Sequence, residues 1–329
     1  MIDTIELTYY DVRIAEVYYK KWRVYTVGEG QGFLCYVYSH KLRNGATITY
    51  AYYPYCNEGG PILKIRLSVP HVVLGNNYTM LYDIKGGIAK VANMLPDIPG
   101  VPELDLYKGR LTRMDPCYNR SVGNLIPHYI RFLRDLTYPG GRITLPYSIC
   151  GVTYKSVSDK GPSATFYDKA AQLRDLGYED DAQKAEGIFR QESLCRKKNI
   201  VTLTHNKLPT VVDITVDLCA DVLERDLKRL GILGSHCGSI DTTIQALLKE
   251  HDPFTVIFLL GFMEANTLSI PEEQLSSALK MSKSTITRRC AELYKAGLPE
   301  KLSHSSVDLQ PLTIDREMAK KFEQEKKIE

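Results

Sequence analysis

Apolar and polar residues alternate along much of the first two hundred residues, the pattern of strands with one buried face. In the segment 63–69, leucine, isoleucine and valine alternate with lysine, arginine and serine. Further strands are predicted where β-branched and aromatic residues gather between glycine or asparagine turns. These segments are 33–40, 46–55, 111–115, 151–156, 163–168 and 188–195.

Helical spacing interrupts this series of strands at three places. Apolar residues at intervals of three and four predict helices within 86–95, 122–133 and 169–186. Pro127 stands inside the second segment and predicts either a kink or a late helix start. This mixed order indicates an α+β domain over residues 1–205, with an antiparallel-rich sheet and packed helices.

From about residue 209 the pattern becomes helical. Apolar residues recur at helical spacing from Val216 to Leu230, and Gly231 follows in a position that ends many helices. Further helices are predicted over 242–249 and 254–265. The charged tail 315–329 is expected to be a frayed helix. The sequence therefore predicts a second, helical domain over residues 206–329.

This second domain contains a pattern typical of a helix-turn-helix. A capping-box spacing at Ser269 starts one helix, and a short break precedes a second helix over 284–296. Basic residues outnumber acidic ones in and around the second helix, as phosphate contacts require. A helical hairpin with a solvated charged face is an equally weighted alternative. The candidate DNA contacts are Lys283, Arg288 and Arg289.

The composition is that of a globular protein. Its 329 residues include 42 Lys plus Arg, 39 Asp plus Glu and 44% hydrophobic residues, which excludes disordered and collagen-like classes. The longest apolar run, 253–263, is shorter than the roughly 20 residues that cross a bilayer. The start of the chain lacks the basic region of a signal peptide. We therefore expect a cytoplasmic protein without a membrane partner.

Several enzyme classes lose support because their motifs are absent. The seven histidines form no H-x-H or H-E-x-x-H pattern, and neither a P-loop nor a G-x-S-x-G motif occurs. The eight cysteines contain no C-x-x-C pair, which argues against a zinc ribbon and against a disulfide scaffold. The remaining candidate chemistry is acidic and phenolic.

Two strands each place a basic and an acidic side chain on one face. Arg113 and Asp115 are separated by two positions, as are Arg190 and Glu192, and a strand has a period of two. Two such carboxylates on neighbouring strands can hold Mg²⁺ or Mn²⁺ beside a phosphate that the arginines or a lysine steer. The commoner interpretation of each pair is an ion pair without catalytic function.

Two tyrosines have a lysine close to them on a predicted strand. Tyr167 is followed by Lys169, and Tyr154 by Lys155. A phenol has a pKa near 10, so a tyrosine nucleophile needs a nearby cation or metal. Most of the 22 tyrosines are expected to be packing residues, because tyrosine is common in strands. Those before residue 56 are candidate stacking platforms for unpaired bases.

Taken in order, these segments resemble one family, the replication initiators of filamentous bacteriophages of the gene II type. More distantly, they resemble the initiators of rolling-circle plasmids. The similarity covers most of the chain and ends with the helix-turn-helix-like unit. Besides the first strand, the matching segments are 64–68, 73–77, 113–115, 166–169 and 189–192.

The resemblance implies a site-specific DNA endonuclease and strand transferase that starts rolling-circle replication in a bacterial host. It implies Mg²⁺ or Mn²⁺ as cofactor, a phosphotyrosine intermediate, duplex and single-stranded phage or plasmid origin DNA as substrate, and a host helicase and polymerase as partners. The C-terminal part corresponds to the gene X product of such phages. In residue terms, Tyr167 resembles the nucleophile, and Asp115 and Glu192 resemble metal ligands.

Two positions differ from the family pattern, and two alternatives remain. Lys64 stands where filamentous-phage relatives carry an acid, and Asn119 replaces an acid of plasmid relatives. Tyr154 stands where plasmid relatives keep their active tyrosine, so it is the rival nucleophile to Tyr167. The alternative function is a non-enzymatic helix-turn-helix regulator or an iteron-type plasmid initiator. A tyrosine recombinase is disfavoured because its ordered catalytic residues are absent.

Overall fold

The computed structural model describes most of the chain. The described residues are 1–27, 35–42, 45–52, 60–94, 104–136, 141–144, 150–156, 163–233, 240–268, 270, 272–295, 298 and 309–325.

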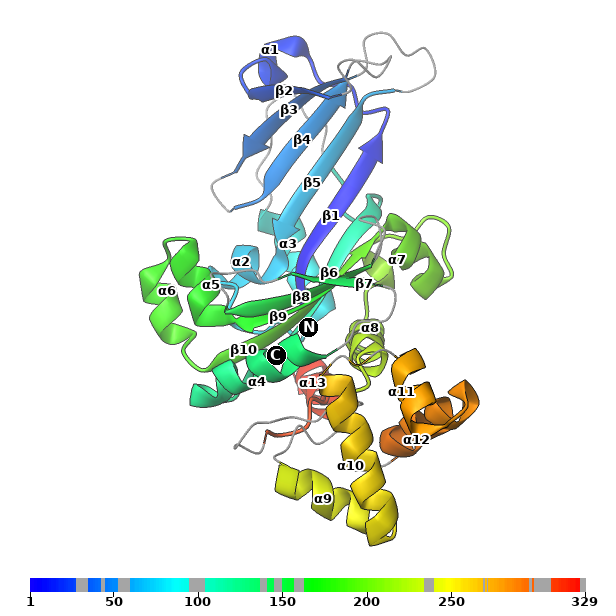
Figure 1. Ribbon diagram of the computed structural model, residues 1–329. Helices are drawn as coiled ribbons and strands as arrows, with labels where there is room; N and C mark the ends of the chain where they lie inside the picture. Colours follow the sequence, from blue (N-terminus) through cyan, green and yellow to red (C-terminus); the bar gives the residue numbers. More distant parts are fainter. Residues whose placement is uncertain are drawn as a thin grey trace.

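Within these residues, ten strands form one sheet with the order β2-β3-β4-β5-β1-β6-β10-β9-β8-β7 (Figure 1). Every pair of neighbouring strands is antiparallel. The predicted α+β class with an antiparallel-rich sheet is confirmed. The strands are β1 (Ile2–Tyr10), β2 (Arg23–Val27), β3 (Cys35–Lys41), β4 (Thr47–Tyr52), β5 (Ile62–Ser68), β6 (Arg110–Ser121), β7 (Gly141–Thr144), β8 (Gly151–Ser156), β9 (Ser163–Asp168) and β10 (Ile188–Arg196).

Helices connect the strands and continue after the last of them. Pro127 lies in the first turn of its helix, which confirms the late start rather than a kink. Gly231 has a φ of 69° just after another helix, the left-handed conformation expected there. The helices are α1 (Glu16–Tyr19), α2 (Val69–Leu74), α3 (Ile84–Met94), α4 (Ile126–Asp135), α5 (Lys169–Asp175), α6 (Glu179–Lys184), α7 (Lys197–Thr204), α8 (Val216–Arg229), α9 (Ile240–Leu248), α10 (Pro253–Thr267), α11 (Glu272–Leu279), α12 (Lys283–Lys295) and α13 (Arg316–Glu325).

The two faces of the sheet differ in character. Along β5, Leu63, Ile65 and Leu67 are buried, whereas Lys64 and Arg66 lie on the opposite, more exposed face. The first set belongs to one large hydrophobic cluster with apolar residues of α2, α3, α4 and α8. We call the face with Lys64 and Arg66 the polar face, and the other the core face.

The hydrophobic clusters do not divide at residue 205. Val216, Leu223 and Leu227 of α8 belong to the same cluster as the sheet. A separate cluster joins α9, α10 and α12 through residues such as Leu247, Leu259 and Ile286. In the described residues, the chain therefore leaves the sheet's core after residue 233 rather than at the predicted boundary.

The charged tail returns to that core instead of fraying. Leu312 and Ala319 are fully buried in the sheet's cluster. Arg316 of α13 lies 2.7 Å from Glu224 and from Asp221 of α8. The expectation of a frayed tail is wrong for residues 315–325, the described part of that tail, because Ala319 packs in the sheet's cluster and Arg316 is paired with α8. None of the described helices is both long and apolar enough to span a membrane.

Candidate active site

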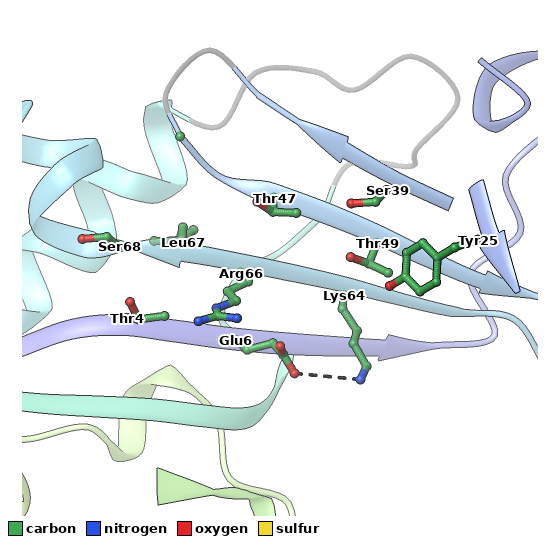
Figure 2. A pocket seen from close by; sticks show the side chains of 11 residues that line it. Thr4, Glu6, Tyr25, Ser39, Thr47, Thr49, Lys64, Arg66, Leu67 and Ser68 are labelled. Carbon is green, nitrogen blue, oxygen red and sulfur yellow. Dashed lines mark ion pairs between the residues drawn. The ribbon is translucent and has the colours of Figure 1, made fainter. Parts of the chain in front are cut away.

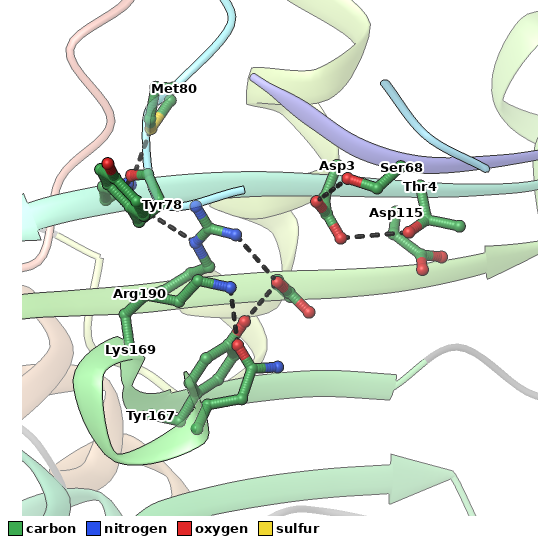
Figure 3. A network of polar contacts seen from close by, with 12 residues as sticks. Asp3, Thr4, Ser68, Tyr78, Met80, Asp115, Tyr167, Lys169 and Arg190 are labelled. Carbon is green, nitrogen blue, oxygen red and sulfur yellow. Dashed lines mark hydrogen bonds and ion pairs between the residues drawn. The ribbon is translucent and has the colours of Figure 1, made fainter. Parts of the chain in front are cut away.

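Tyr167 lies on the polar face of the sheet, near the end of β9, two strands away from the central strand β6. It is paired with Arg190 of β10, which in turn is paired with Asn119 of β6. The alternation along a strand puts Glu192 on the same face as Arg190. Figure 3 shows Tyr167, Lys169 and Arg190 turned toward one another, with Asp3 and Asp115 farther along the same face.

A hydrogen-bond network links the members of this group. The hydroxyl of Tyr167 donates to Oε1 of Glu192. Nη1 of Arg190 lies 3.4 Å from the same oxygen, and Nε of Arg190 donates to Oδ1 of Asn119 at 2.6 Å. Asn119 donates its amide to the backbone oxygen of Tyr78 at 2.7 Å. The network therefore joins three strands to the loop that follows α2.

Burial strengthens the electrostatic interactions between the charged groups of the network. The side chains of Tyr167 and Arg190 are 0% and 1% exposed. Burial opposes the charge of Arg190, but the neighbouring Tyr167, Cys117 and Glu192 together raise the pKa of its guanidinium. An ion in such a low-dielectric place acts strongly on its neighbours. Arg190 is therefore a fixed positive charge next to the phenol.

Lys169 supplies a second buried nitrogen at the start of α5. Its Nζ lies 5.8 Å from the centre of the Tyr167 ring and donates to Oε1 of Gln172 at 2.6 Å. Burial, reinforced by the positive charge of Arg190, lowers the pKa of this ammonium to about 8. Lys169 can thus exchange a proton near neutral pH.

Asp115 forms the second acidic position of the predicted site. Both of its oxygens accept from Arg113, at distances of 2.6 to 3.0 Å. Burial nevertheless raises the pKa of this carboxyl to about 6, although Arg113 acts in the opposite direction. Both predicted arginine–acid pairs therefore form ion pairs, as the non-catalytic interpretation of each motif expects.

The predicted metal ligands match a hard cation in donor type. Asp115 and Glu192 offer carboxylate oxygens from the neighbouring strands β6 and β10, and Mg²⁺ and Mn²⁺ prefer such ligands. Among the described residues, no group of three or more His, Cys, Asp or Glu side chains is placed to hold a metal ion. A bound cation would therefore have Asp115 and Glu192 as its protein ligands. Asp115 would have to give up its ion pair with Arg113 to bind the cation.

Tyr154 does not join this group. It is paired with Ala164, which lies three positions before Tyr167 in β9. Strand residues an odd number of positions apart point to opposite faces, so Tyr154 lies on the core face. Its side chain is fully buried against Phe166, and its hydroxyl donates to the backbone oxygen of Leu133 in α4. This placement disfavours Tyr154 as the nucleophile, because its hydroxyl is bonded inside the hydrophobic cluster, on the face opposite Glu192 and Arg190.

The predicted DNA-contacting residues have different surroundings. Lys155 lies on the polar face, half-buried, in β8. Arg288 is exposed on α12, but Arg289 lies 2.6 Å from Glu292 and over the ring of Phe258 at 5.1 Å. Arg289 therefore helps to pack α12 on α10. The side chain of Lys283 lies outside the described residues.

Several members of the site were not identified by sequence reasoning. Asp3 accepts hydrogen bonds from Thr4 and Ser68 beside Asp115, and Gln172 holds Lys169. Asn119 was noted in the sequence only because it stands where plasmid relatives carry an acidic residue. Only Asn119 follows a pattern that could have found it, since Arg113, Asp115 and Asn119 stand at alternate places in β6 and mark the polar face.

No family model matches the chain. No curated protein shows significant similarity to it. The functional argument therefore depends on the geometry of the polar face.

Proposed function

We propose that this chain is a rolling-circle replication initiator that nicks and rejoins one strand of origin DNA through Tyr167. The observation that supports it is the contact of the Tyr167 hydroxyl with Glu192, next to the cations of Arg190 and Lys169. A base, a phenol and fixed positive charge are the parts that phosphoryl transfer to tyrosine requires. The resemblance to filamentous-phage initiators implies the same nucleophile.

The proposed step conserves the phosphoester. The phenolic oxygen attacks a backbone phosphorus and passes its proton to Glu192, while the bond from phosphorus to the 3′ oxygen breaks. Lys169, whose Nζ lies 5.8 Å from the centre of the phenol ring, would protonate the leaving oxygen. The products are a 5′-phosphotyrosine link and a 3′-hydroxyl primer, and the reverse step closes the strand.

The cofactor of the proposed reaction is Mg²⁺ or Mn²⁺. Asp115 and Glu192 would hold it, and the ion would supply charge stabilisation at the phosphate. Release of Arg113 from Asp115 would leave that guanidinium free to contact DNA.

The helix pair α11 and α12 is proposed to bind the duplex origin. The two helices are separated by the three residues 280–282, and Arg288 is exposed on the second one. This spacing suits a helix-turn-helix whose second helix enters the major groove. A host helicase and polymerase would then extend the primer.

The test is a nicking assay with supercoiled DNA that carries the element's own origin, in the presence of Mn²⁺. We expect a nicked circle linked to a peptide that contains Tyr167. The Tyr167→Phe variant should bind the origin like the wild type, while its nicking falls below about one thousandth, because the nucleophilic oxygen is removed.

Tyr154→Phe is the matched control for this experiment. It removes one buried hydrogen bond on the core face, so it should lower stability by about 1 kcal/mol and leave nicking intact. Full nicking by Tyr167→Phe, or loss of nicking in a folded Tyr154→Phe protein, would contradict the proposal.

The second candidate is a non-enzymatic DNA-binding regulator or iteron-type initiator. The observation in its favour is that Tyr167 is closed to solvent and both acids are paired with arginines. In that case Glu192→Gln and Asp115→Asn would leave replication of the element unchanged. The nickase proposal expects replication to stop in both variants.

A further inference from the structure

The sheet consists of two halves with the same topology. From the centre outward, one half has the order β1-β5-β4-β3-β2 and the other has the order β6-β10-β9-β8-β7. In both halves the innermost strand comes first in the sequence and is followed by a helix and a three-stranded meander. A last strand then returns beside the first. The antiparallel pair of β1 and β6 joins the halves, which are therefore related as by a two-fold axis between these two strands.

The ends of two strands align these halves residue by residue. β5 ends at Ser68 and β10 at Arg196, and a helix follows directly in each case. With these positions matched, Lys64 corresponds to Glu192. The pairing partners then agree as well, because Thr49 faces Lys64 and Thr165 faces Glu192.

This alignment shows that the first half lacks the reactive group. Tyr167 corresponds to Ala51, and Arg190 to Ile62, which are paired with each other as Tyr167 and Arg190 are. The acid Glu192 is replaced by the cation of Lys64. The position that matches Tyr167 therefore has no hydroxyl, and the position that matches Glu192 has a positive instead of a negative charge.

That surface forms an open groove. One hollow of about 450 Å³ crosses β2 to β5 and β1, and a second of about 530 Å³ continues over β1 and β6 to the start of α7. Glu6, Lys64 and Arg66 line both hollows, so the two are continuous. Figure 2 shows these three side chains projecting from adjacent strands into the first hollow.

The groove is basic and has two exposed aromatic rings. Its lining includes Lys64, Arg66, Arg113, Arg196 and Lys197, whereas Glu6 is the only acid among the described lining residues. Tyr25 is 50% exposed at one end, and Tyr10 is 47% exposed in the second hollow. Cations that follow a groove, together with exposed rings, are the features with which proteins bind unpaired strands.

We propose that the first half of the sheet is a non-cleaving copy of the second half that holds single-stranded DNA. The strand would lie along the groove with its phosphates on Lys64 and Arg66 and with bases stacked on Tyr25 and Tyr10. Arg113 lines the groove and also contacts Asp115, so the groove leads directly to the candidate active site. The proposal deepens the proposed function and rests on it for the choice of DNA.

The test measures binding of a fluorescein-labelled oligothymidylate of roughly 20 nucleotides to the full chain by fluorescence anisotropy. We expect Lys64→Ala and Arg66→Ala each to weaken binding about fivefold and to reduce the salt dependence, because each removes a phosphate contact. Lys228→Ala removes an exposed cation of α8, outside the groove, and should leave binding unchanged.

A second pair of variants tests stacking. Tyr25→Leu should weaken binding by about tenfold, whereas Tyr25→Phe keeps the ring and should bind like the wild type. Equal binding by the wild type and all groove variants would overturn the proposal. So would tighter binding of an oligouridylate of the same length, because the ligand would then be RNA.

The nicking assay separates this proposal from the proposed function. Tyr167→Phe should bind the oligonucleotide like the wild type. If the groove variants weaken binding as expected but the wild type does not nick DNA, only the nickase proposal would be overturned. Nicking with no effect of the groove variants on strand binding would overturn the groove alone.

Discussion

Asp115 shows how burial and a single ion pair compete at one carboxyl group. The residue is 5% exposed, and burial raises its pKa from 3.8 to about 6 in spite of two-pronged contact with Arg113. A carboxyl that is easier to protonate in the folded than in the unfolded state makes stability depend on pH. At neutral pH, the ionised carboxylate of Asp115 therefore lowers the free energy of unfolding.

The sign of this dependence gives a prediction. Between about pH 4 and pH 6 the folded chain binds more protons at Asp115 than the unfolded chain, so the free energy of unfolding should fall as pH rises. The contribution is at most about 3 kcal/mol. Urea unfolding of the wild type and Asp115→Asn measures it, and the variant should show a smaller fall. The exposed Asp180→Asn is the control, and an unchanged slope in Asp115→Asn would contradict the assignment.

Single residues of the site differ in how well the sequence predicts them. Strand periodicity placed Arg190 and Glu192 on one face and Tyr167 beside Lys169, and the structure confirms these placements. It did not separate Tyr167 from Tyr154, because the two lie on different strands, and periodicity does not show which face of each is buried. That distinction requires the pairing of β8 with β9.

At the scale of elements, α13 is the clearest case in which tertiary packing determines the structure. Its sequence is charged, yet Ala319 is fully buried, and Arg316 is paired with two acids of α8. Short elements such as β2, α1 and α7 were not predicted either, since four to eight residues carry too few periods of a pattern. Long alternating strands such as β5 were predicted with small errors at their ends.

The buried tail predicts that a distant substitution destabilises the sheet. Leu312→Ala leaves a cavity beside Leu233 and should cost about 2–5 kcal/mol in the free energy of unfolding. Fluorescence of Trp22, the single tryptophan, reports unfolding of the sheet's own cluster. The partly exposed Met318→Ala should change this value by less than about 0.5 kcal/mol. A Trp22 transition that Leu312→Ala does not shift would contradict the docking of the tail.

At the scale of the whole molecule, the described residues form two principal hydrophobic clusters that do not follow the predicted domains. The larger one unites both halves of the sheet with α8 and α13, and the other joins α9, α10 and α12. The sequence predicted a change of character near residue 209, whereas in the described residues the last strand, β10, ends at Arg196 and helices follow from Lys197. It could not show that the first of those helices belongs to the sheet, since an amphipathic helix does not identify the surface that it covers.

This arrangement predicts two separable unfolding transitions. Leu7 and Leu259 are each fully buried, one in the larger cluster and one in the cluster of α9, α10 and α12. Leu7→Ala should lower the midpoint of the transition that Trp22 reports, and Leu259→Ala should lower only the other one, each by about 2–5 kcal/mol in stability. Calorimetry of the two variants, with Trp22 fluorescence recorded in parallel, measures both effects. If either substitution shifts both transitions equally, the clusters fold as one unit, and the sheet and the helices α9, α10 and α12 are not independent parts of the chain.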